Sequence, residues 1–90
     1  MLQLPVTYAK VASAVNNCAK SPQFSSLIGM LGGAPNVTLV LFGIFQTSLA
    51  QQNQDKKYWI AKLEAAFAVA GVYQTKLRQM CDAIVTNLWC

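Results

Sequence analysis

Apolar residues recur at helical spacing from the start of the chain. Thr7 is a suitable N-cap, and apolar residues follow it at spacings of three, four and three as far as Cys18. This pattern predicts an amphipathic helix that ends near Lys20. Ser21 and Pro22 then suit the N-cap and first position of a second, shorter helix, because proline in the first helical turn loses no hydrogen bond.

The next boundary lies at a pair of glycines, Gly32 and Gly33, which suit the left-handed conformation that ends helices, and we expect Pro35 to complete this break. Residues 37–45 form a continuous apolar run that suits a buried strand or a buried helix equally well. We favour a helix capped by Asn36, because no second strand is present to satisfy the backbone of a lone strand.

The strongest pattern begins after Asp55, a suitable N-cap. Its apolar positions alternate spacings of three and four: Ile60, Leu63, Phe67, Ala70, Gln74, Leu77, Cys81, Ile84 and Leu88, with Gln74 as the one polar member. Such spacing is typical of an a/d heptad seam, which Trp59, Ala66, Tyr73 and Met80 widen on one side. It predicts one helix from Asp55 to Leu88, about 50 Å long at 1.5 Å per residue.

A helix of that length would extend beyond shorter neighbours and leave apolar surface bare. Residues 65–72 include no polar side chain, so we expect them to be covered by the same chain or by another subunit. Gln74 either fixes register or oligomeric state by hydrogen-bonding a counterpart, or lies where the bundle opens to water. The predicted interaction surface is Trp59, Ile60, Leu63, Phe67, Tyr73, Gln74, Leu77, Met80, Ile84 and Leu88.

The predicted fold is therefore all-α. Residues 1–90 form a single domain, a small bundle of about four helices with a long C-terminal helix, completed by self-association. Composition adds a constraint, since 54% of the residues are hydrophobic and only 11% are charged, against about 25% in an average domain. Residues 21–54 include no ionisable side chain, so they are expected to lie in the core, in an interface or in lipid.

The net charge is +4, from seven cations and three acids. The cations are scattered and include one arginine, which argues against a nucleic-acid partner. The adjacent Lys56, Lys57 and Tyr58 form a candidate anion or interface anchor, for a membrane surface, a nucleic-acid base or an acidic protein groove. The alternative is a solvated helix start whose aromatic side chains turn inward.

The residues that most catalytic sites need are missing. The chain has no histidine, no C-x-x-C pair and no ordered phosphate-binding glycine loop. Glu64 and Asp82 would lie five turns apart on one long helix, too far for a carboxylate pair. We therefore expect no enzyme activity, catalytic residue, metal or cofactor.

Cys18, Cys81 and Cys90 cannot all pair within one chain. They are expected either as buried apolar residues in a reducing compartment or, for Cys90, as an intermolecular bridge. Met1 is followed by Leu-Gln-Leu-Pro, with neither a basic leader nor an unbroken apolar run of the length that a secretory signal needs. We therefore expect the protein in the cytoplasm, with membrane association as the alternative.

Three functions fit these features. The first is a non-enzymatic protein-protein interaction module, a soluble self-associating bundle that acts as an adaptor, inhibitor or immunity-type protein on an unidentified protein partner. The second is a membrane-associated or filament-forming subunit, pilin-like or pore-forming, with residues 27–50 in lipid. The third is a carrier of small apolar ligands, with aromatic side chains lining a cavity.

Overall fold

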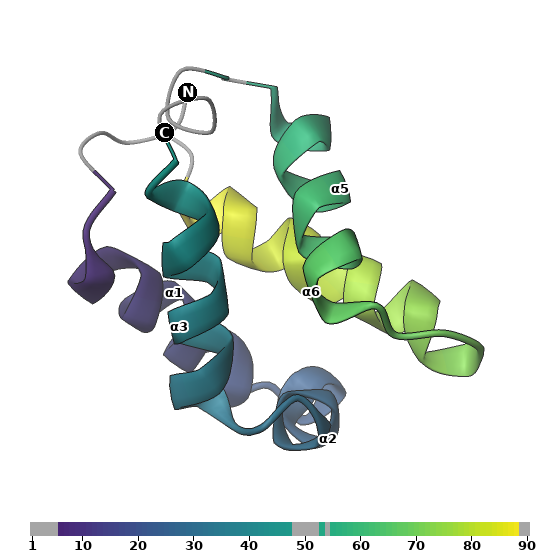
Figure 1. The fold of residues 1–90 in the computed structure, drawn as a ribbon. Coiled ribbons are helices and arrows are strands. Elements are labelled where there is room, and N and C mark those ends of the chain that lie inside the picture. The colour runs from purple at the N-terminus through teal and green to yellow at the C-terminus, as the bar shows by residue number, and fades with distance from the viewer. Residues whose placement is uncertain (1–5, 48–52, 54, 89–90) are drawn as a thin grey trace.

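A computed structural model of the chain describes residues 6–47, 53 and 55–88. Within these ranges it shows five helices and no strand, which confirms the all-α prediction (Figure 1). The helices are α1 (Tyr8–Ala19), α2 (Pro22–Met30), α3 (Ala34–Phe45), α5 (Lys56–Phe67) and α6 (Val72–Leu88). They pack into a body measuring 32 × 23 × 20 Å, in which α6 contacts α1, α2 and α5.

Three of the predicted helix starts are confirmed. The Oγ1 atom of Thr7 accepts a hydrogen bond from the Lys10 backbone N–H at 3.3 Å, and Asp55 Oδ1 accepts one from Lys57 at 3.0 Å. Pro22 occupies the first turn of α2 after Ser21. The side chains of Thr7 and Asp55 therefore accept hydrogen bonds from N–H groups that have no partner within the helix, and Pro22 has no N–H group to satisfy.

The start of α3 differs from the prediction. The helix begins at Ala34 with Pro35 inside its first turn, so this proline initiates the helix instead of extending the break. Gly32 and Gly33 make the turn at φ 100° and 90°. The Asn36 side chain does not cap α3; its amide donates to the carbonyl oxygen of Leu31 at 2.6 Å and satisfies the end of α2.

The predicted long C-terminal helix is wrong, because the chain reverses between Phe67 and Val72. Ala68 adopts a left-handed conformation at φ 48° and ψ 38°, and Gly71 follows at φ 71°. A continuous 50 Å rod would project beyond a body whose longest dimension is 32 Å. Reversal lets α5 and α6 pack against each other, so that the two halves of the seam cover one another inside one chain.

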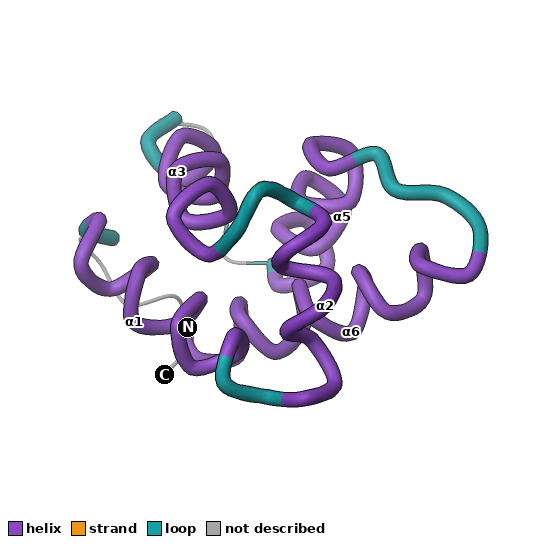
Figure 2. The backbone as a smooth tube through the Cα atoms, turned by 90° about the horizontal axis from the view of Figure 1, so that it is seen from below, coloured by secondary structure: helices purple, strands orange, loops and turns teal. Residues whose placement is uncertain are grey.

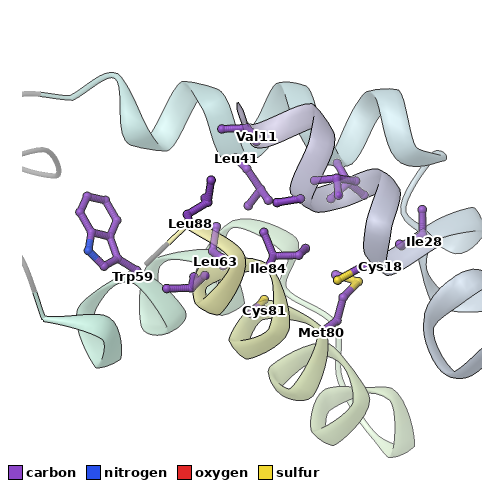
Figure 3. Close-up of a cluster of buried hydrophobic side chains, with 14 of the residues drawn as sticks. Val11, Cys18, Ile28, Leu41, Trp59, Leu63, Met80, Cys81, Ile84 and Leu88 are labelled. Carbon is purple, nitrogen blue, oxygen red and sulfur yellow. The ribbon is translucent and has the colours of Figure 1, made fainter. Parts of the chain in front are cut away.

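The hydrophobic core is built around α6. Figure 3 shows side chains from α1, α2, α3 and α5 gathered beside this helix, among them Val11, Leu41 and Leu63. Figure 2 shows the backbone from below, with α6 running past the other helices. The fully buried large side chains are Trp59, Phe45, Leu27, Leu41, Leu63, Leu77, Met80, Ile84, Val11, Val15, Val37 and Val85.

Candidate functional site

Most of the predicted interaction surface lies in this core. The side chains of Trp59, Leu63, Leu77, Met80, Ile84 and Leu88 are each no more than 4% exposed. Ile60 and Phe67 are half-buried, whereas Tyr73 and Gln74 are exposed. Most of the heptad seam is therefore not a free surface, because it is buried when the single chain folds. Gln74 lies where α6 meets solvent, which agrees with the second of the two interpretations of this residue.

The predicted anchor at the start of α5 is not a single unit. The Lys56 ammonium pairs with Asp82 at 3.1 Å and also donates to the Thr86 hydroxyl. Tyr58 turns inward and packs edge-to-face on Trp59, with ring centroids 5.5 Å apart. Of the three predicted residues, Lys57 alone is exposed. Lys56 therefore ties α5 to α6 and Tyr58 packs on the core, whereas the Lys57 side chain stays exposed.

A groove of about 540 Å³ lies between α5 and α6. Its lining consists of Lys57, Ile60, Ala61, Glu64, Arg78, Gln79 and Asp82. Chain reversal brings Glu64 and Asp82 to this one groove, which corrects the expectation that they lie far apart. Each carboxylate contacts a cation: Glu64 binds Arg78 through two hydrogen bonds of 3.1 and 3.3 Å, and Asp82 binds Lys56. The hydrogen bond from Arg78 to Glu64 raises the pKa of the Arg78 guanidinium.

The thiols in the core are not poised for nucleophilic chemistry. Burial raises the pKa of the Cys18 thiol. Burial also raises the pKa of the Cys81 thiol to about 12, and the nearby Glu64 carboxylate and Cys18 thiol add to the effect. Both cysteines are free and buried. Since a reactive thiol needs a lowered pKa and access to solvent, neither residue meets the requirement. Within residues 6–47, 53 and 55–88, no three His, Cys, Asp or Glu side chains form a group suited to a metal ion.

Neither the groove nor a smaller one of about 210 Å³ between α1 and α6 is lined by an aromatic side chain. Phe24, Phe45 and Trp59 instead lie in the core, where the ring centroids of Phe45 and Trp59 are 4.7 Å apart, whereas Tyr8 and Tyr73 are exposed. The indole N–H of Trp59 is buried and has no hydrogen-bond partner among the residues that the structure describes.

The structure also exposes large apolar side chains that the sequence pattern did not single out. Val72 is 85% exposed, Leu39 62% and Met30 57%. Leu39 lies three residues after Asn36 and four before Gly43, and both neighbours are exposed. A polar residue and a small residue at helical spacing on either side of Leu39 are the signal that could have identified the outer face of α3.

Comparisons with known proteins give no relative. No family model, curated protein or solved structure matches the chain.

Two sets of exposed residues stand out as candidates. The first, called the α2–α3 surface, is the exposed residues of two helices that carry no charge: Pro22, Gln23, Ser25, Ser26, Gly29, Met30, Pro35, Asn36, Leu39 and Gly43. Gln23 among them donates a hydrogen bond to Gln79 of α6. The second, the α5–α6 tip, is the reversal formed by residues 65–73. Among the described residues no single helix is long and apolar enough to cross a membrane; α2 and α3 pass that test only as a pair bent by 79°.

Proposed function

We propose that this protein is a non-enzymatic interaction module that self-associates through its α2–α3 surface and uses that assembly to bind a protein partner, as an adaptor, inhibitor or immunity-type protein does. The observation that carries the proposal is Leu39, whose side chain is 62% exposed on the outside of a helix that has no charged residue. An interface core is typically depleted of charge, and this surface has that composition.

The shape of α3 around Leu39 supports close packing. Gly43 lies one turn further along the same face, and a Cβ placed there would meet nothing within 4 Å. A second helix can therefore approach the backbone at this point. In an assembly with two-fold symmetry, residues near the axis meet their own copies. An uncharged surface avoids the repulsion that such a contact would cause between like charges.

Light scattering on the purified full chain tests the proposal. We expect wild-type mass to rise with protein concentration toward a fixed multiple of 9.8 kDa, and we expect Leu39→Lys to remain at 9.8 kDa while retaining wild-type helicity. Val72→Lys is the matched control, because it places the same charge at another exposed apolar position outside the α2–α3 surface; it should assemble as wild type does. A wild-type protein that stays at 9.8 kDa at every concentration, or a Leu39→Lys variant that still assembles, would contradict the proposal.

A further inference from the structure

The α5–α6 tip is an apolar projection. Residues 65–73 carry no ionisable group except the Tyr73 hydroxyl. Val72 is 85% exposed and Tyr73 is 44% exposed. Both Figure 1 and Figure 2 show this reversal extending outward from the remaining helices. Residues 65–72, which the sequence predicted to be covered, therefore remain largely open to solvent in the single chain.

Backbone hydrogen bonds within the turn hold its conformation. The Ala68 N–H donates to the Glu64 carbonyl at 2.9 Å, and the Gln74 N–H donates to the Gly71 carbonyl at 3.1 Å. Only Phe67 and Val69 within the tip pack partly against the core. The apolar side chains between the two helices are consequently held outside the body without being used to stabilise it.

The tip itself and the part of α6 that follows it include no acid. Between Ala65 and Cys81 the chain has no acid and two cations, Lys76 and Arg78. The nearest acid, Glu64, is bound by Arg78. Lys76 is exposed and lies four residues after Val72, so the two share a face of α6. Because side chains on a helix lean toward its N-terminus, Lys76 leans toward the tip.

The exposed apolar side chains and the nearby lysine favour an anionic lipid surface over a second copy of the chain. A second copy packed tip to tip would bring each Lys76 near its own symmetry mate, with no acid in the segment to offset the repulsion. An anionic lipid surface instead accepts exposed apolar side chains, a tyrosine at headgroup level and a lysine beside the phosphates.

We propose that the α5–α6 tip is an interfacial membrane anchor that places Val72 and Tyr73 among the headgroups of an anionic bilayer while Lys76 contacts lipid phosphates. The anchor is separate from the α2–α3 surface, so it does not depend on the proposed self-association.

Sedimentation of the full chain with sucrose-loaded vesicles tests the anchor, using phosphatidylcholine alone or with phosphatidylglycerol. We expect binding to the anionic vesicles that weakens as salt is added. Val72→Asp should lower the partition coefficient about tenfold or more. Lys76→Gln should lower it about fivefold on anionic vesicles. An aspartate in the first turn of α6 suits the helix dipole, so Val72→Asp should keep wild-type helicity.

Asn16→Asp is the matched control, since it adds the same negative charge as Val72→Asp at an exposed position of α1, outside both candidate surfaces, and should leave vesicle binding almost unchanged. Failure of the wild-type chain to bind anionic vesicles, or undiminished binding by Val72→Asp, would overturn the anchor. So would a wild-type assembly that Val72→Asp dissociates without any vesicle binding, since the tip would then be a protein contact. Loss of assembly in Leu39→Lys bears only on the proposed function.

Discussion

Arg78 reaches back across the α5–α6 reversal to Glu64, with its Nε atom 3.1 Å from Oε1 and its Nη2 atom 3.3 Å from Oε2. In a continuous helix, fourteen residues would separate their Cα atoms by about 21 Å. The ion pair is therefore a feature of the reversed chain, and it lies at the edge of the groove between the two helices.

This pair predicts a small effect on stability, because Arg78 is largely exposed and solvent screens surface ion pairs. We expect Arg78→Ala to leave the urea midpoint almost unchanged, and a double-mutant cycle with Glu64→Gln to give a weak coupling that declines in salt. A strong, salt-resistant coupling would show that the pair is better shielded than its exposure indicates.

Ala68 predicts a stabilising substitution. Ala68 is in a left-handed conformation, which costs a non-glycine residue about 1–2 kcal/mol. Glycine avoids this cost, but it also gives the unfolded chain more conformational freedom, which offsets part of the gain. Ala68→Gly should therefore raise the free energy of unfolding by up to about 1 kcal/mol in urea titrations. Ala65→Gly, inside α5, is the control and should lower it by about 0.5–1 kcal/mol. A destabilised Ala68→Gly variant would mean that the reversal is not as described.

Substitution of Leu77 distinguishes burial within one chain from burial in a contact between subunits. This side chain is 1% exposed within one chain, so Leu77→Ala should lower the free energy of unfolding by about 2–5 kcal/mol. The loss should be the same at every protein concentration, as measured by chemical denaturation. If Leu77 instead lay in a contact between subunits, the loss would grow as the protein is diluted.

Cys81 predicts a loss of stability in alkali. Its thiol has a pKa of about 12 in the folded chain and about 9 when unfolded, so folding favours the protonated form. The contribution of this thiol is complete below about pH 9 and is lost progressively as pH rises toward about 12. Denaturation across this range should show a shallower decline for Cys81→Ala than for wild type. Equal slopes would indicate that the thiol is not buried.

The fold could be predicted wherever short-range chemistry decides it. Thr7 and Asp55 cap helices in the structure because a side-chain oxygen two or three residues away can satisfy a free N–H. Pro22 begins α2 for a similar local reason. Such signals act over one helical turn, so they appear in the sequence itself.

The candidate surfaces could not be predicted in the same way. Leu39 sits in a continuous apolar run, where its residue type does not distinguish it from the buried Leu41 two positions later. The spacing of Asn36 and Gly43 around it is a weak signal, because it does not say which face of the helix the rest of the chain covers. The reversal at Ala68 was also hidden, because alanine favours helices and the isolated Gly71 was the only local sign of a turn.

The sequence by itself determined that the chain is helical, where three helices begin, and which residues repeat at heptad spacing. Only the tertiary structure decided what the heptad seam packs against. Burial of Leu63 and Leu77 within one chain requires contact between residues that a straight helix would hold apart. Periodicity specifies an apolar face but not what that face packs against. The hydrophobic effect is non-directional, so any contact that removes the face from water stabilises the chain, and the fold of the whole chain decides which contact forms.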